Sequence, residues 1–448
     1  MARRAPFDAT RVAPRPGTVR RLGGIAAAGA IALAAGSAHA QTQVMPTVLD
    51  TGIPFDLPVT ERVTVLQRQH PETAALGVRT GSFLLFPQVL VEGGATDNVF
   101  GSANDTNSDV YTRIVPRIDA RSQWSRHAVQ AHAIGSFKKF ATYSLKDENS
   151  GYDFGVDGRL DVVGDTNVRA AVNADRVYIN QFSGDFPQFA AASVPLDRQV
   201  ASLRGTYAFN RLQVVGDVNV SRLNYHDTTS IAGQRIDQDY LDRTVTRFIG
   251  RAEYNLTPVT SFFVQANYLI HDYRQASTLD RSGDELRFTA GAAFDITPLI
   301  RTRLGAGYLQ RNYNQAGVSS LSGLALDLQL DYFLTQLTTI SVAARRDVRD
   351  AVLPNSPGYT STRGAVEVDH ELFRNLILIA RADYENDDYS RLNRKDTLFH
   401  VGAGATYTAN RHLVIAPTID YVDRGSSGTD LGQRFKEVRA AIGLTVRQ

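Results

Sequence analysis

Apolar and polar residues alternate with a period of two along most of the chain. One window sets Phe262, Val264, Ala266, Tyr268 and Ile270 against Ser261, Gln265, Asn267 and His271, and similar windows cover 285–295, 324–334 and 413–421. Successive side chains of a β-strand point to opposite faces, so the pattern predicts strands that have two different environments. Helical spacing fits none of these windows.

Turn-forming residue pairs recur at intervals of about 40 residues, which fits one strand, a loop and a returning strand. They are Ser125-Arg126, Asp165-Thr166, Asn210-Arg211, Thr257-Pro258, Thr297-Pro298, Thr335-Gln336, Arg374-Asn375 and Asn410-Arg411. Longer stretches rich in Gly, Asn, Asp and Ser lie around them, over 101–108, 146–150, 183–196, 227–238, 275–283, 314–320, 352–358, 391–395 and 425–432. Short turns at one rim and longer loops at the other are typical of bacterial outer-membrane barrels, whose short turns face the periplasm. We therefore expect an all-β fold, a transmembrane antiparallel up-and-down β-barrel of about 18 strands, with about 16 as the alternative.

The length of the predicted strands separates this fold from soluble alternatives. They run for about 12 to 16 residues, against about 5 to 6 in soluble sheets, and can cross a membrane when tilted. Soluble propellers also repeat near 40 residues, but with four strands in each repeat. Aromatic residues are expected at both membrane interfaces. Those near the short turns are Tyr207, Tyr254, Phe294, Tyr332, Phe373 and Tyr407, and those near the loops are Tyr225, Tyr268, Tyr308, Tyr384 and Tyr421.

The N-terminal region has a different pattern. Arginines precede an apolar run over 22–35, and Ala38 and Ala40 form an A-x-A site, so residues 1–40 are expected to be a secretory signal peptide cleaved after Ala40. Residues 41–79 lack the strand pattern and contain four prolines. They are expected to form either a periplasmic tail or a small plug that could also dock a partner, and 80–448 to form the barrel.

Charge and cysteine content remove several classes of function. The full chain has 48 basic and 46 acidic residues, but residues 1–40 contain six arginines and one aspartate, so the processed chain is slightly acidic. A basic pI is therefore no sign of nucleic-acid binding. The absence of cysteine excludes disulfides, thiolate catalysis and Cys-ligated metals.

The entry into the barrel carries a family resemblance. The stretch His70-Pro71-Glu72, then 77–87 with the sequence GVRTGSFLLFP, then 96–100 with TDNVF, resembles the putative β-barrel porin 2 family of outer-membrane proteins. The resemblance implies a barrel embedded in outer-membrane lipid. It also implies either an uncharacterised porin or a conduit for exopolysaccharide export that works with a periplasmic export protein. Like other such proteins, the chain would be inserted by the barrel assembly machinery.

If the apolar set faces lipid, the opposite set faces the lumen, and residues spaced by two or four share a face. Short ladders of like charge then line the channel. The basic ladders are Arg113, Arg117 and Arg121; Arg243, Arg247 and Arg251; and Arg301 and Arg303. The acidic ladders are Asp153, Asp157 and Asp161; Glu367, Asp369 and Glu371; and Asp383 and Glu385. The ladders are expected either to pair with one another and stiffen the wall or to set up a transverse field on passing solutes.

One loop is a candidate constriction. The stretch 183–196 is expected to be the longest loop and carries Phe186, Pro187 and Phe189. It either folds into the lumen or lies over the mouth.

Chemistry-bearing motifs give little support for an enzyme. The sequence contains no H-E-x-x-H, G-x-S-x-G or phosphate-binding glycine loop, and no cofactor or metal is expected. His226, His271 and His400 are placed where acidic residues could approach them, as an Asp/His hydrolase would need. The sequence thus predicts a non-enzymatic porin-like channel for hydrophilic solutes. A polysaccharide conduit is the alternative, and a surface-binding or structural barrel is the third.

Overall fold

The computed structural model describes residues 63–448, apart from 69, 184–185, 188–189, 276–278, 352 and 354–355. The predicted signal peptide and residues 41–62 lie outside the described residues. None of the described helices is long and apolar enough to cross a membrane. They are three short 3-10 turns, η1 (Val65–Gln67), η2 (Ser144–Lys146) and η3 (Asp239–Leu241).

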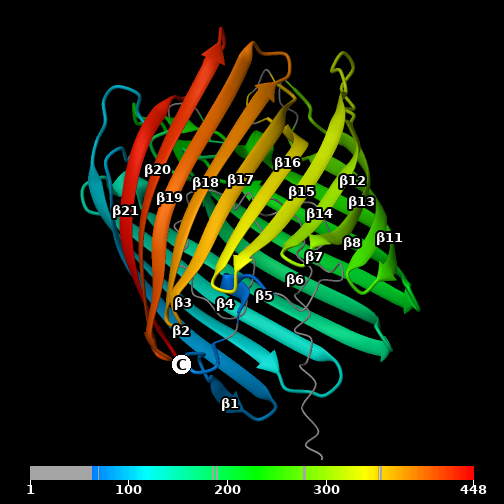
Figure 1. Ribbon diagram of the computed structural model, residues 1–448. Coiled ribbons are helices and arrows are strands. Elements are labelled where there is room, and N and C mark those ends of the chain that lie inside the picture. Colours follow the sequence, from blue (N-terminus) through cyan, green and yellow to red (C-terminus); the bar gives the residue numbers. More distant parts are fainter. Residues whose placement is uncertain are drawn as a thin grey trace, which may run out of the picture.

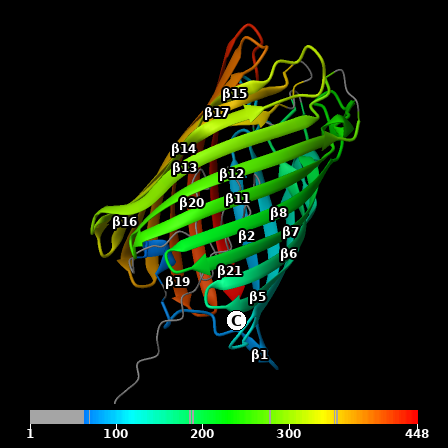
Figure 2. The ribbon, with the colours of Figure 1, turned by 90° about the vertical axis from the view of Figure 1, so that its right-hand side faces the viewer.

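A closed antiparallel barrel of 18 strands forms the body of the protein (Figures 1 and 2). The barrel strands are β2 (Phe83–Thr96), β3 (Asp109–Ser122), β4 (Ala128–Phe140), β5 (Glu148–Val163), β6 (Thr166–Ile179), β7 (Val194–Phe209), β8 (Leu212–Tyr225), β11 (Arg243–Thr257), β12 (Thr260–Tyr273), β13 (Gly283–Thr297), β14 (Ile300–Arg311), β15 (Leu321–Thr335), β16 (Thr338–Asp350), β17 (Gly358–Phe373), β18 (Leu376–Tyr389), β19 (Arg394–Asn410), β20 (Leu413–Gly428) and β21 (Phe435–Arg447). Each strand pairs with the next along the chain, and β21 returns to pair with β2, from Gln88 opposite Arg447 to Thr96 opposite Arg439. The predicted strand number and topology are confirmed.

Two further hairpins lie outside this ring of strands. β1 (Val78–Thr80) folds back on the start of β2. β9 (Thr228–Thr229) and β10 (Arg235–Ile236) pair within the loop between β8 and β11. That loop covers 226–242 and is longer than the β6–β7 loop, which covers 180–193. The expectation that the β6–β7 loop is the longest was therefore wrong, because the β9–β10 hairpin extends its neighbour.

The short turns share a local chemistry that explains the repeat in the sequence. The hydroxyls of Thr257, Thr297 and Thr335 each accept a hydrogen bond from the backbone N–H two residues later, at 3.2, 3.2 and 3.1 Å. Such side-chain bonds stabilise tight turns. Asn210 and Gly164 instead adopt positive φ values of 54° and 56°, a conformation that these residue types tolerate well.

The two faces of the barrel wall differ as the alternation predicts. Large apolar side chains on the outer face stay exposed, among them Phe262 (50%), Leu286 (50%) and Ile419 (54%). Most of the predicted interface aromatics also lie on this face, but Tyr225 does not. It is 3% exposed and packs on the inner face with Leu241 and Phe186, so its assignment to the outer girdle was wrong.

Candidate channel lumen and its constriction

The charged ladders lie on the inner face of the barrel. On β11 and β14 the outer face is marked by the exposed Phe248 and Leu304, and the ladder arginines occupy the alternate positions. Arg251, Arg301 and Arg303 are almost fully buried there, with exposures of 7%, 6% and 7%. In the same way the exposed Val156, Val366 and Tyr384 mark the outer faces of β5, β17 and β18, which carry the acidic ladders on their other side.

Most acidic ladder residues have a basic partner nearby. The carboxylate of Asp153 lies 3.0 Å from His132, that of Asp157 lies 3.7 Å from Arg169, and that of Asp161 lies 2.9 Å from Arg159. Glu371 is bound by Arg68, Asp383 by His400 at 2.9 Å, and Glu385 by Arg363 at 2.6 Å. Glu367 is attracted by Arg381, whereas one carboxylate oxygen of Asp369 has no hydrogen-bond partner among the described residues.

The basic ladders interact with acidic, polar and aromatic groups. Arg117 binds Asp119 at 2.7 Å, Arg251 lies 3.9 Å from Glu253, and Arg303 donates to Gln329 at 3.1 Å. Arg113 donates to Ser136 at 3.3 Å, and Arg247 interacts electrostatically with Glu285 and Asp217. Arg121, Arg243 and Arg301 lie over the rings of Phe86, Tyr225 and Phe333, at 5.0, 5.5 and 5.2 Å.

These contacts place both signs of charge side by side around the wall. The partners of the acidic ladders come from residues outside the basic ladders, usually on the same strand or the next one. Close opposite charges cancel at short range, and salt screens what remains beyond about 8 Å at physiological ionic strength.

The β6–β7 loop folds inward and reaches from β6 to the inner faces of β19, β20 and β21, and it is called the crossing loop below. It leaves the rim at β6, and Phe182 then packs against Leu398, Val422 and Phe435 on the inner faces of β19, β20 and β21. The Phe182 and Phe435 rings meet edge to face at 5.8 Å, and the Arg439 guanidinium lies 4.7 Å above the Phe182 ring. In the closed sheet β2, β3, β4 and β5 lie between β6 and β21, and Gln181 also contacts Val99 and Lys146 in the loops of these strands. The loop therefore crosses this arc of the inner face.

Hydrogen bonds hold the crossing segment at its far end. Arg424 of β20 donates to the backbone oxygens of Gln181 and Ser183, at 3.1 and 2.9 Å. The Gln181 amide donates to the carbonyl of Val99 and to Glu437, both at 3.3 Å. A buried ammonium completes the contact, since Lys146 donates to Gln181 at 3.3 Å. Burial lowers the pKa of Lys146 from 10.5 to about 8.

The residues predicted for a constriction lie at the near end of this loop. Phe186 packs with Val194, Leu196, Tyr225 and Leu241, beside the wall from which the loop departs. Pro187 accepts a backbone hydrogen bond from Ala190 at 3.3 Å, and Phe189 lies outside the described residues. Phe182 and Arg424, which make the crossing contact, were missed by sequence reasoning. An aromatic residue in a long loop is a weak signal, and nothing in the local sequence marks Arg424.

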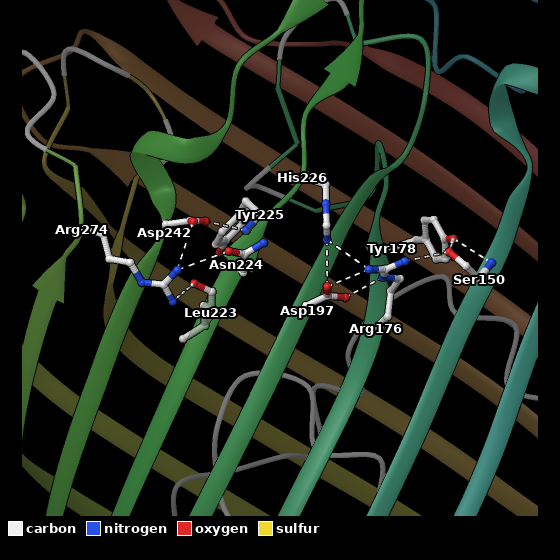
Figure 3. A network of polar contacts seen from close by, with 10 residues as sticks. All are labelled: Ser150, Arg176, Tyr178, Asp197, Leu223, Asn224, Tyr225, His226, Asp242 and Arg274. Atoms are coloured by element: carbon white, nitrogen blue, oxygen red, sulfur yellow. Dashed lines mark hydrogen bonds and ion pairs between the residues drawn. The ribbon is translucent and has the colours of Figure 1, made fainter.

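A polar network fixes the strand ends at the base of this loop (Figure 3). Asp197 of β7 accepts two hydrogen bonds from Arg176 of β6, at 2.6 and 2.7 Å, and lies 2.8 Å from His226. Next to it, the Asp242 carboxylate accepts a bond from the backbone N–H of Tyr225 at 2.7 Å and pairs with Arg274 at 3.4 Å. Burial raises the pKa of Asp242 despite these contacts. The network holds β6, β7, β8 and the following loops in register.

The three histidines considered for catalysis each approach a carboxylate. His226 lies 2.8 Å from Asp197, His271 lies 3.4 Å from Asp350, and His400 lies 2.9 Å from both Asp383 and Asp420. In every case an arginine shares one of these carboxylates: Arg176 with Asp197, Arg311 with Asp350 and Arg381 with Asp420. The arrangement is that of ion networks, which join neighbouring strands at His226 and His400 and join β12 to β16 at His271.

One group of carboxylates has ligand-like spacing. Oxygens of Asp227, Asp237 and Asp239, in the loop between β8 and β11, lie within 4.8 Å of one another. Arg235 binds Asp227 and supplies positive charge to the group. Sequence reasoning did not single out these residues.

The chain is similar to one protein family and to several solved structures. A model of the family described as Putative beta-barrel porin 2 matches residues 70–448. No curated protein matches the sequence. Similar solved structures include OccK1 (OpdK) of Pseudomonas aeruginosa, with 10% identity, a TM-score of 0.46, and 81% of this chain and 99% of that chain covered. Another is OccAB3 of Acinetobacter baumannii, with 9% identity, a TM-score of 0.44, and 81% and 99% covered. Because the family model covers most of its length, the chain belongs to the Putative beta-barrel porin 2 family and is an integral β-barrel of the outer membrane.

Proposed function

We propose that this porin-family barrel is a passive channel for small hydrophilic solutes of either charge, whose size limit is set by the β6–β7 loop. Barrels of about 16 to 18 strands leave an aqueous channel when their interior is not filled by other segments. The inner wall here is charged and the outer wall apolar, as a water-filled passage through lipid requires.

The pairing of charges on the inner face is the observation that carries this proposal. Acidic and basic side chains pair along one strand, as Arg117 with Asp119 on β3, or between neighbouring strands, as Asp153 of β5 with His132 of β4. A solute of either sign would therefore find groups of the opposite charge on this face. Strong selection by sign would require an unbalanced wall.

Swelling of liposomes that contain the full protein tests this function. Neutral, anionic and cationic solutes of similar size should enter at similar rates. Larger solutes should be excluded sharply, because the crossing loop narrows the passage. Liposomes that swell no faster than protein-free ones in every solute would contradict a solute channel.

A matched pair of variants tests the role of the wall charges. Arg117→Gln removes one positive charge from a partly exposed inner position, and Asp153→Asn removes one negative charge from another. The first should favour cations and the second anions, with opposite shifts in reversal potential. Two variants that shift selectivity in the same direction, or not at all, would contradict the proposed role of these residues.

The polysaccharide conduit makes a different demand on the same barrel. A polymer chain would have to pass the crossing loop, so the segment around Phe182 would have to leave its contacts on β19, β20 and β21. A deletion strain separates the two functions. Loss of secreted polymer together with unchanged uptake of small solutes would replace the solute channel by the conduit.

A further inference from the structure

A second segment enters the barrel from the opposite end. Thr64 and Val65 are 5% and 1% exposed, and the backbone N–H of Val65 donates to the hydroxyl of Thr339 at 3.1 Å. Thr339 is on the inner face of β16, opposite Asp369 of β17. Residues 64–67 therefore lie inside the barrel, against its inner wall, at the end that carries the short turns. This segment, η1, is drawn in blue in Figure 1.

An arginine fastens this segment to the wall. Arg68 donates to Glu371 of β17 at 2.5 Å and to the backbone carbonyl of Gln336 in the β15–β16 turn. The Glu371 side chain is 6% exposed, so the pair is shielded from water on the carboxylate side. Charge-assisted hydrogen bonds of this kind are among the stronger polar contacts in proteins.

The rest of the segment leads to another part of the rim. Arg447 of β21 donates to the carbonyl of Thr73 at 3.0 Å, and β1 pairs with β2 a few residues later. Strands β18, β19 and β20 lie between these contacts and β17 in the closed sheet. The described residues of this segment therefore contact the inner wall at β16 and β17 and the same rim at β21.

The wall under this segment is acidic. Asp369 is 1% exposed and has an oxygen without a hydrogen-bond partner among the described residues, and the charged groups that act on it are Glu367 and Asp331. Arg68 brings a positive charge to this end of the wall. Removal of the Arg68 guanidinium would take this positive charge away from Glu371 and make this part of the wall more acidic.

We propose that residues 63–68 and 70–73 form an intramolecular plug of the periplasmic opening, held in place by the bond between Arg68 and Glu371. The plug limits passage independently of the β6–β7 loop, which lies at the other rim. The effect of the plug on solute passage rests on the proposed solute channel. The docking of the plug does not, because it depends only on contacts within the chain.

Docking is measured first, without any reference to transport. The chain contains no native cysteine, so Val65→Cys gives one labelling site. A maleimide reagent should label it slowly in the otherwise unchanged protein and about tenfold or more faster when Arg68→Gln is added. Arg68→Lys should restore much of the protection. Arg374→Gln, an exposed arginine in the β17–β18 turn of the same rim, should leave the labelling rate unchanged.

The effect on flow is measured by cross-linking the plug. Val65→Cys combined with Thr339→Cys and with Arg68→Gln, which releases the segment, should form a disulfide on oxidation, and single-channel conductance should fall on oxidation and recover on reduction. Failure of the disulfide to form, or labelling of Val65→Cys that is fast and independent of residue 68, would overturn the plug. A disulfide that forms without changing a measurable conductance would also overturn it. If the labelling results are as expected but no variant conducts, the solute channel fails and the docked segment stands.

Discussion

Removal of the Phe182 ring should release the crossing loop from β19, β20 and β21. The ring is 4% exposed, packs against Leu398, Val422 and Phe435, and lies under the Arg439 guanidinium. Replacing a buried Phe by Ala typically costs about 3 to 5 kcal/mol. At about 1.4 kcal/mol for each tenfold change, even the lower value shifts the ratio of docked to released loop by roughly a hundredfold. The loop ends remain anchored by the network around Asp197, so the barrel itself should stay intact.

Single-channel recording of Phe182→Ala in planar bilayers measures this shift. Openings to a higher conductance, in which the loop has left its contacts, are called wide events. They should become roughly a hundredfold more frequent or longer in total duration. Phe209→Ala is the matched control, because Phe209 is 65% exposed near a short turn and should leave the events unchanged. A heat-modifiable, folded Phe182→Ala protein with the event statistics of the unsubstituted chain would refute the docking of the loop as the size limit.

Three further predictions concern the same architecture. Arg424→Gln removes the guanidinium that binds the carbonyls of Gln181 and Ser183, so wide events in bilayer recordings should rise about tenfold or more, and an unchanged frequency would contradict the anchor. Burial lowers the pKa of Lys146 from 10.5 to about 8, so the docked loop should gain stability as pH rises from about 8 to 10.5. Wide events should then become rarer over this pH range. The opposite trend would show that the ammonium stabilises docking. Phe288→Arg places a charge on the outer face, where Phe288 is 52% exposed, and should lower the free energy of unfolding in vesicles by about 2 to 4 kcal/mol, whereas Ser202→Arg on the inner face should cost much less.

The barrel could be predicted from the sequence because lipid and water impose opposite demands on the two faces of every strand. The alternation of residues such as Phe262, Val264 and Tyr268 records the face directly, and the Thr-centred turns mark where strands reverse. The expectation that aromatic residues near the strand ends face the lipid fails near the loops, where Tyr225 faces inward. At that level the lumen is packed with loop residues, so an apolar ring is tolerated on the inner side.

The constriction could not be predicted in the same way. The two residues of its key hydrogen bond, Arg424 and Ser183, are 241 positions apart in sequence, and neither belongs to a local motif. The spacing of charged residues along a strand likewise predicts which of them share the inner face. It does not predict which residue each of them pairs with. Asp153 binds His132 and Glu371 binds Arg68, contacts that depend on strand register and on a segment outside the barrel strands.

The balance of charge along the inner wall is measured by the reversal potential across a tenfold gradient of potassium chloride. A channel with a balanced, mixed-charge wall should conduct stepwise and reverse close to zero. An ideally selective pore would reverse near about 59 mV in magnitude, the value for a tenfold ratio of a singly charged ion. A potential near that limit of either sign, or the absence of conductance even after release of the β6–β7 loop by Phe182→Ala, would contradict the account.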